Sequence, residues 1–142
     1  MNNSMSKTQT KTQVLIVDDH PMVRDWLAQM IRREPDLAVC GEASDGAEAI
    51  EAVRNLKPDV VVLDITMPKM SGLEAASRIS KLGLGSRVLM FTMHESERLP
   101  VEVRQTGAHG VVLKSQAARD LIRAIDRLLA GGTFFGPEPV LR

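Results

Sequence analysis

Residues 14–20 read VLIVDDH, a short apolar run that ends in two adjacent acidic residues. Four apolar residues in succession, without polar alternation, are typical of a strand that is buried on both faces of a parallel sheet. The run ends at Asp18 and Asp19, whose like charges repel each other and whose burial costs free energy. One carboxylate at this place could simply cap the helix that follows. Two carboxylates suggest a bound cation and other polar groups directed at the same point.

Four more apolar runs alternate with helical patterns farther along the chain. After residues 14–17, the predicted strands cover residues 37–41, 60–63, 87–91 and 110–113. The predicted helices lie within residues 20–35, 45–58, 72–83, 95–107 and 115–132. Five strands that alternate with five helices predict an α/β fold in which helices cover a parallel sheet.

Two of these helices have recognisable beginnings. Asp45 and Glu48 resemble a capping box, which predicts a helix start at that point. Pro100 lies inside the weaker pattern of residues 95–107, and proline is tolerated only in the first turn of a helix. We therefore expect this helix to begin near Pro100 rather than at Ser96. It should have about two turns, a length that is marginal without packing.

The composition is that of one ordinary globular domain. The chain has 142 residues, 44% of them hydrophobic and 25% charged, and its formal net charge is zero. It has no cluster of Lys and Arg with which to bind a nucleic-acid backbone by itself. Cys40 is the only cysteine, which excludes a disulfide framework and a cysteine-rich zinc site and favours the cytosol. We expect a disordered leader over residues 1–12, a folded domain over 13–132, and no membrane-spanning segment.

Polar side chains stand at the carboxyl ends of four predicted strands. Asp18 and Asp19 follow the first strand, Asp64 the third, Thr92 the fourth and Lys114 the fifth. These ends share one edge of an open parallel sheet, and ligands bind at that edge. Carboxylate oxygens suit Mg²⁺, and a carboxylate can itself accept a phosphoryl group. The residue types therefore predict phosphoryl transfer to an acid, with a lysine and a hydroxyl holding the phosphoryl oxygens.

Each of these residues also has an ordinary structural explanation when it is taken singly. Asp19 and Thr92 could cap helices, and Asp64 could belong to a turn. Lys114 could be a solvated lysine. A purely structural role does not explain three acids at one edge, because like charges so close together resist simultaneous ionisation without a counter-ion.

Four motifs in this order resemble the receiver domain of two-component response regulators. They are VLIVDDHPMVR (14–24), DVVVLDITMPKMSGLEA (59–75), LMFT (89–92) and GAHGVVLKS (107–115). The resemblance covers residues 14 to 132 and is greatest to the NarL/FixJ branch, whose members carry a LuxR-type DNA-binding helix-turn-helix. It implies a doubly wound, flavodoxin-like or CheY-like (βα)5 fold with a five-stranded parallel sheet in the order 2-1-3-4-5.

The resemblance implies that Asp64 is the phosphoacceptor, which takes a phosphoryl group from the phosphohistidine of a sensor histidine kinase. Asp19, Asp64 and the backbone carbonyl of Thr66 would ligate Mg²⁺ directly, while Asp18 would act through a metal-bound water. Such a protein is not an enzyme in the ordinary sense, because it catalyses only its own phosphotransfer and dephosphorylation.

The resemblance also implies which residues respond to the phosphate. Lys114 would pair with the phosphorylated Asp64, and Thr92 would move to hydrogen-bond the phosphate. Thr66 and His94 match the variable positions that tune the lifetime of the phosphoryl group in this family.

Two further expectations concern how a signal leaves the site. Members of the family usually have Tyr or Phe three residues before the lysine, whereas this chain has Val111, which is stiff and lacks a ring. Residues 133–142 resemble the start of a linker to an output domain. Phe134 and Phe135 lie beyond the last predicted helix without an obvious partner, which favours an excised receiver over a stand-alone one. DNA would be contacted only through a C-terminal helix-turn-helix outside this chain, and a homodimer could form on phosphorylation.

Two rival functions remain open. A haloacid-dehalogenase-type phosphatase also uses an aspartate, a threonine and a lysine around Mg²⁺, but it needs the pattern D-x-D, which neither Asp18 nor Asp64 begins. A pseudo-receiver would keep the fold and bind partners without phosphorylation. The complete acid set argues against the second reading, whereas Val111 and Pro100 argue for it.

Overall fold

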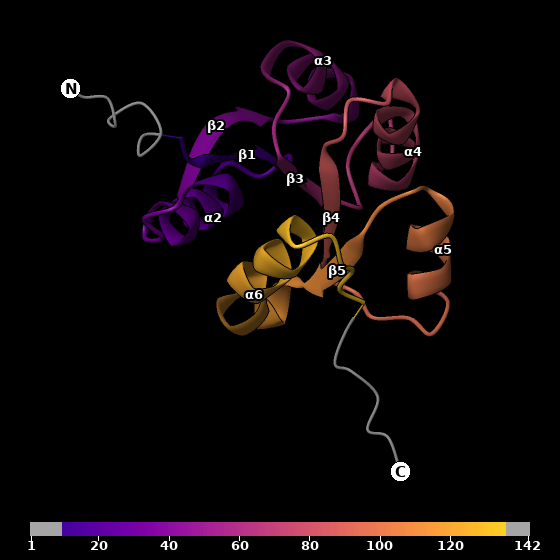
Figure 1. Cartoon of the computed structure of the whole chain (residues 1–142). Helices are drawn as coiled ribbons and strands as arrows, with labels where there is room; N and C mark the ends of the chain where they lie inside the picture. Colours follow the sequence, from indigo (N-terminus) through magenta and orange to yellow (C-terminus); the bar gives the residue numbers. More distant parts are fainter. Residues whose placement is uncertain (1–9, 136–142) are drawn as a thin grey trace, which may run out of the picture.

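A computed structural model describes residues 10–135 of the chain, and its centre is a five-stranded sheet (Figure 1). The strands are β1 (Thr12–Val17), β2 (Leu37–Ala43), β3 (Val60–Asp64), β4 (Arg87–Thr92) and β5 (Gly110–Leu113). They are all parallel and lie in the order β2-β1-β3-β4-β5. The doubly wound (βα)5 fold and the strand order 2-1-3-4-5 are therefore confirmed.

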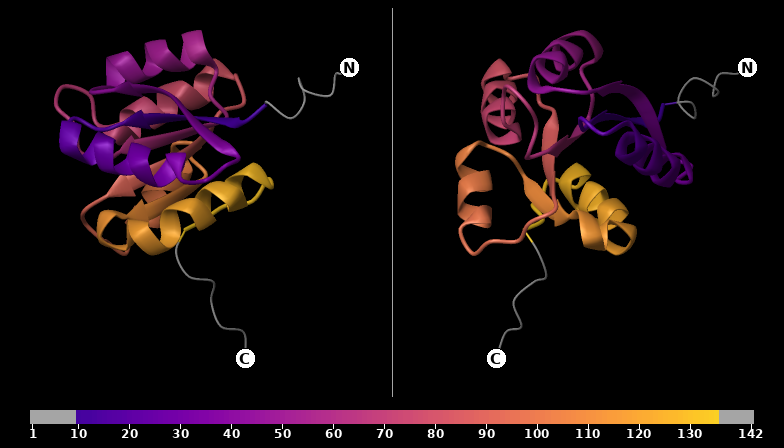
Figure 2. Two further views of the ribbon diagram at one scale, coloured as in Figure 1. Left: turned by 90° about the vertical axis from the view of Figure 1, so that its left-hand side faces the viewer. Right: turned by 180° about the vertical axis from the view of Figure 1, so that it is seen from behind.

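Helices cover both faces of this sheet. They are α2 (Pro21–Arg32), α3 (Gly46–Leu56), α4 (Gly72–Leu82), α5 (Leu99–Gln105) and α6 (Ala117–Leu129), with a short 3₁₀ turn η1 (Lys114–Gln116) before the last. Helices α2 and α6 lie on one face, and α3, α4 and α5 lie on the other (Figures 1 and 2). None of the helices within residues 10–135 is long and apolar enough to cross a bilayer.

The core consists of two apolar layers, one on each side of the sheet. Every residue of β3 is buried, as the continuous apolar run predicted. Successive strand residues point to opposite faces, so Val60 and Val62 join the layer under α2 and α6, while Val61 and Leu63 join the layer under α3, α4 and α5. Burial on both faces leaves the polar strand ends as the accessible part of the sheet.

The predicted helix starts are confirmed. Asp45 caps α3 by accepting a hydrogen bond from the amide of Glu48 at 2.8 Å. The Glu48 carboxylate bonds back to the amide of Ser44 instead of that of Asp45, so the reciprocal contact is displaced by one residue. Helix α5 begins at Leu99 with Pro100 in its first turn and has seven residues.

Some element boundaries differ from the expectation. Strand β1 begins at Thr12, inside the predicted leader, because its pairing with β2 uses backbone groups and needs no apolar side chain. Phe134 is buried and bonded to the edge of β5, so the idea that it lacks a partner is wrong. The rest of the predicted leader, residues 1–9, and of the predicted linker, residues 136–142, lie outside the described residues.

Candidate functional site

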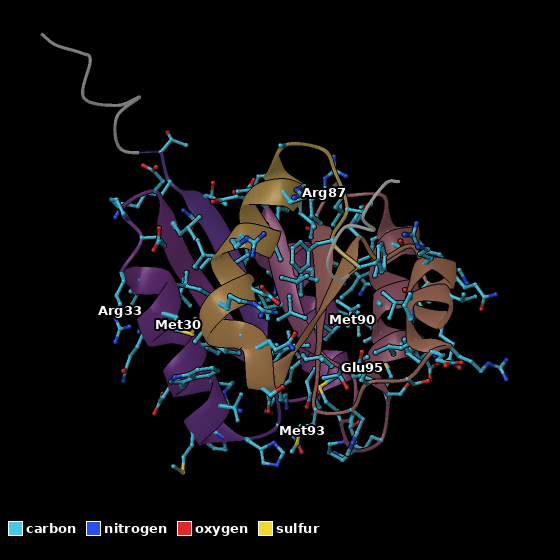
Figure 3. The ribbon with its side chains drawn as sticks, turned by 90° about the horizontal axis from the view of Figure 1, so that it is seen from below. Met30, Arg33, Arg87, Met90, Met93 and Glu95 are labelled. Carbon is cyan, nitrogen blue, oxygen red and sulfur yellow. The ribbon has the colours of Figure 1, made fainter. Side chains whose placement is uncertain are left out.

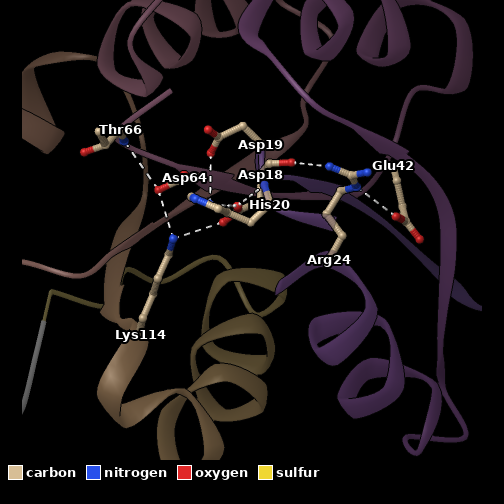
Figure 4. A network of polar contacts seen from close by, with 8 residues as sticks. All are labelled: Asp18, Asp19, His20, Arg24, Glu42, Asp64, Thr66 and Lys114. Atoms are coloured by element: carbon tan, nitrogen blue, oxygen red, sulfur yellow. Dashed lines mark hydrogen bonds and ion pairs between the residues drawn. The ribbon is translucent and has the colours of Figure 1, made fainter. Parts of the chain in front are cut away.

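The acidic residues at the carboxyl ends of β1 and β3 meet at one edge of the sheet (Figure 4). One side-chain ligand atom from each of Asp18, Asp19, His20 and Asp64 lies within 4.8 Å of the others. Asp18 is fully buried and Asp64 is 3% exposed. Strands β1 and β3 are direct neighbours in register, Val17 beside Leu63, which is why residues 46 positions apart in the chain can come together.

Lys114 completes the cluster from the end of β5. Its Nζ lies 3.1 Å from Oδ2 of Asp18 and 3.3 Å from Oδ1 of Asp64. The same ammonium lies 5.4 Å from the centre of the Phe91 ring, at the end of β4. One cation thus faces two buried carboxylates.

The excess of negative charge at the site affects the pKa of Asp64. Burial and the nearby charge of Asp18 raise the pKa of Asp64 from 3.8 to about 6, although Lys114 acts in the opposite direction. Ionisation of Asp64 is therefore unfavourable in the protein alone, and a further cation at this place would favour it.

Asp19 offers an oxygen atom to such a cation. Its Oδ1 is buried and accepts no hydrogen bond, although Nδ1 of His20 lies 3.2 Å away. Three clustered carboxylates with such an oxygen suit a hard divalent ion like Mg²⁺, which takes oxygen ligands and retains some of its water. The donor set therefore fits the predicted cofactor.

A hollow of about 440 Å³ opens onto these acids. Its lining includes Asp19, His20, Asp64, Thr66, Met67, Pro68, Met93, His94 and Lys114. The amide of Thr66 donates to Oδ1 of Asp64 at 3.3 Å. Both predicted tuning residues, Thr66 and His94, thus border the hollow.

Thr92 and Val111 lie outside this lining. The Thr92 side chain is buried, and its hydroxyl accepts a hydrogen bond from the amide of His94 at 3.2 Å. Val111 is half-buried in β5 and borders a different, smaller cavity. Figure 3 shows the direction of β4: Arg87 lies near one end of the molecule, and Met93, just after the strand, lies near the other.

Three residues that position the acids had no such role in the sequence analysis, which interprets His20 as a loop residue beside the acids and assigns no role to the other two. His20 follows Asp19 directly, and its Nδ1 lies 3.1 Å from Oδ1 of Asp18. Arg24 donates to the backbone carbonyl of Asp18 at 2.6 Å and to Glu42 at 3.1 Å. Its place one helical turn after His20 was the available signal, since residues i and i+4 share a helix face.

Gly72 is the third such residue. A Cβ atom at Gly72 would stand 2.0 Å from the carbonyl oxygen of Asp64. The amide of Gly72 donates a hydrogen bond to the carbonyl of Ile65 at 2.7 Å. Only glycine permits this approach of α4 to the end of β3. The sequence shows the glycine but not the backbone that it meets.

Comparison with known proteins places these features in a family. The family model of the response regulator receiver domain matches residues 14–126. The nitrate/nitrite response regulator NarL of Escherichia coli K12 is 37% identical over 123 residues, which are 87% of this chain and 57% of NarL. The transcriptional regulatory protein DegU of Brevibacillus brevis is 34% identical over 92% of this chain and 55% of its own length. The chain therefore spans little more than half the length of these relatives.

Solved structures agree in fold. A LuxR-family two-component response regulator from Aurantimonas sp. SI85-9A1 superposes with a TM-score of 0.86 at 38% identity, covering 89% of this chain and 91% of that one. The isolated REC domain of RcsB from Salmonella enterica serovar Typhimurium, solved in the presence of phosphomimetic BeF3⁻, gives 0.81 at 26% identity, covering 89% and 94%.

Proposed function

Because the chain belongs to the response regulator receiver family and its relatives include NarL-type and LuxR-family regulators, we propose that it is a phosphorylation-dependent signalling switch. Asp64 accepts a phosphoryl group from the phosphohistidine of a sensor histidine kinase. The observation that carries this proposal is the position of Asp64: a buried carboxyl beside an open hollow, with Lys114 at 3.3 Å and two further acids around it.

Mg²⁺ is the proposed cofactor. Asp19, Asp64 and the backbone carbonyl of Thr66 would hold it directly, and Asp18 would act through a water molecule. When bound, the ion supplies the positive charge that allows the three acids and an incoming phosphate to approach one another. Side chains of the protein itself accept the phosphoryl group and bind its oxygens.

In the transfer step, a carboxylate oxygen of Asp64 attacks the phosphorus of the phosphohistidine. A P–O bond forms while the P–N bond breaks, and the imidazole leaves with the electron pair. Lys114 then exchanges its contact with the Asp64 oxygen for the phosphoryl oxygens. Thr92 releases the amide of His94 and turns its hydroxyl toward the phosphate. Dephosphorylation by water ends the signal, so the protein acts only on itself and not as an enzyme on other substrates.

The partners follow from the relatives. We propose that the chain acts in the cytoplasm, that a sensor histidine kinase donates the phosphoryl group, and that phosphorylation allows a homodimer to form. NarL and DegU are named as regulators, and the Aurantimonas protein as a member of the LuxR family. We propose that this chain likewise controls transcription and reaches DNA only through a helix-turn-helix domain beyond residue 142.

Labelling with acetyl phosphate tests the proposal. We expect Mg²⁺-dependent, stoichiometric label on the protein, which Asp64→Asn abolishes and the exposed control Asp25→Asn retains. Release of many phosphates per chain would indicate a phosphatase instead. Absence of label from a folded, Mg²⁺-loaded protein would indicate a pseudo-receiver.

A further inference from the structure

Residues 133–135, the strap, run along the open edge of β5 after α6 has ended (Figure 1, yellow). Phe134 forms a parallel bridge with Gly110. Its amide donates to the carbonyl of His109 at 3.0 Å, and its carbonyl accepts from the amide of Val111 at 2.7 Å. The strap is a sixth strand reduced to one residue, and it covers part of the edge that β5 would otherwise expose.

The two rings of the strap reach opposite faces of the sheet. Phe134 is 7% exposed and belongs to the apolar layer under α2 and α6. Phe135 is half-buried and packs against the layer under α3, α4 and α5. The guanidinium of Arg104, on α5, lies 4.0 Å from the centre of the Phe135 ring. Since neighbouring strand residues alternate between faces, this short segment contacts both layers at once.

A cavity of about 90 Å³ lies beside the Phe135 ring. Its walls include Val111 of β5, Leu99 and Pro100 at the start of α5, and Asp120 of α6. The short helix α5 and the Phe135 ring that packs against it therefore both border unfilled space. A well-packed core lacks this space, so two arrangements of ring and helix are feasible here.

Strand β5 connects this region to the acids. Phe134 bonds to the amide of Val111 in β5 and to the carbonyl of His109 just before β5. Lys114 follows the last residue of β5 and contacts Asp18 and Asp64. The cavity wall also includes Glu95 and Ser96, in the segment that leads from Thr92 and His94 into α5. Lys114 and Thr92 thus each adjoin a segment that borders the strap or its cavity.

We propose that the strap reads the state of Asp64 and passes it to the chain beyond Phe135, with the Phe135 ring as the moving part. This inference rests on the proposed phosphorylation of Asp64. The strap docks on the arrangement in which Lys114 pairs with both acids. When Lys114 exchanges its contact with the Asp64 oxygen for the phosphoryl oxygens, β5 and α5 adjust around the cavity, and the ring takes a second position. A ring on the following segment thus serves where β5 itself has only Val111.

Fluorine NMR tests this with the whole chain. The sequence has three phenylalanines, so labelling with 4-fluorophenylalanine gives three resonances, and Phe135→Leu identifies the one from residue 135. Mg²⁺ and beryllofluoride add the resonances of bound fluoride. We expect these to appear together with a displaced Phe135 resonance.

The affinity for beryllofluoride is a second measurement, because coupling between the strap and the phosphate site must act in both directions. If the strap favours the unphosphorylated arrangement, Phe135→Leu should bind beryllofluoride about five-fold more tightly or better. The matched control is Leu129→Ala, at the end of α6, a residue that is 40% exposed. It should bind as wild type does.

The outcomes separate the inference from the function on which it rests. Bound-fluoride resonances with an unmoved Phe135 signal, or with a Phe135→Leu affinity no higher than that of wild type, overturn the inference alone. Absence of bound fluoride overturns the proposed phosphorylation and the inference together.

Discussion

Asp64 combines burial with a charge that its surroundings disfavour. Its pKa in the folded protein is about 6, above the ordinary 3.8. A raised carboxyl pKa means that the folded state binds its proton more tightly than the unfolded state does. With respect to this group, the metal-free protein is therefore most stable below about pH 4 and loses stability as the pH rises toward about 6.

The first prediction concerns the free energy of unfolding of Asp64→Asn. At pH 7.5 without Mg²⁺, we expect this variant to be more stable than wild type by about 3 kcal/mol, because the amide has no charge to bury. Near pH 4 the difference should vanish, since wild-type Asp64 is then protonated. Urea unfolding at both pH values measures it. An equal difference at the two pH values would show that the pKa of Asp64 is not raised.

The second prediction concerns Gly72, whose lack of a side chain permits contact with the carbonyl of Asp64. Gly72→Ala should destabilise the fold by about 1–3 kcal/mol and displace Asp64, because the added Cβ meets backbone atoms that cannot move aside alone. The control is Gly41→Ala, whose Cβ would meet the ends of two side chains and no backbone atom: Cδ1 of Leu56 at 2.9 Å and Cδ1 of Leu15 at 3.6 Å. Urea unfolding and the rate of labelling by acetyl phosphate should both separate the two variants. Equal effects would count against a positioning role for Gly72.

At the scale of elements, α5 is the shortest α-helix in the described part of the chain. It has seven residues, no side-chain cap at its start and a proline in its first turn. Helices of this length are marginal unless packing supports them, and Leu99 and Val103 are its buried residues.

The third prediction is that amides between His94 and Gln105 exchange rapidly with solvent in the free protein and more slowly with beryllofluoride. The phosphate mimic should engage Thr92, which at present holds the amide of His94 at 3.2 Å, and so order the segment that follows. Helix α6, with thirteen residues, provides the internal control and should be protected in both states. Equal protection of α5 and α6 in the free protein would exclude a loosened α5.

At the scale of the whole molecule, Lys114 links the edge strand β5 to the acids behind β1 and β3. Its ammonium joins the end of β5 to both buried carboxylates. Removal of Lys114 leaves the acceptor in place and removes this link.

The fourth prediction is that Lys114→Ala still takes up phosphate, at a reduced rate, but loses the shifts that the phosphate mimic causes in α5 and β5. Thr92→Ala should behave in the same way, because both groups would contact the phosphate only after transfer. Amide NMR spectra with and without beryllofluoride measure this, with the exposed Lys81→Ala as control. Wild-type shifts in either site variant would disprove the role assigned to that residue.

Much of the architecture could be predicted from local patterns. Continuous apolar runs such as residues 60–63 can only be buried on both faces, so they predicted a parallel sheet, and residues 110–113 match β5. Pro100 predicted the start of α5 because a ring without an amide hydrogen excludes every later position in a helix.

The sequence by itself determined which groups stand at the strand ends, because the end of each apolar run is a local feature. Asp18, Asp19, Asp64 and Lys114 were all found in this way, and the structure brings them together. Only the tertiary structure decided how these groups share charge. The pairing of Lys114 with Asp18 as well as Asp64, and the raised pKa of Asp64, depend on distances between strands that no local pattern contains.

The position of the strap, in contrast, could not be predicted from the sequence. Residues after α6 carry no period from which pairing could be predicted, and two phenylalanines beyond a helix appear partnerless in the sequence. Their place depends on the open edge of β5 and on Gly110, where a Cβ would stand 2.5 Å from the carbonyl oxygen of Phe134. A free strand edge exists only once the sheet has assembled, which is why the structure alone could reveal it.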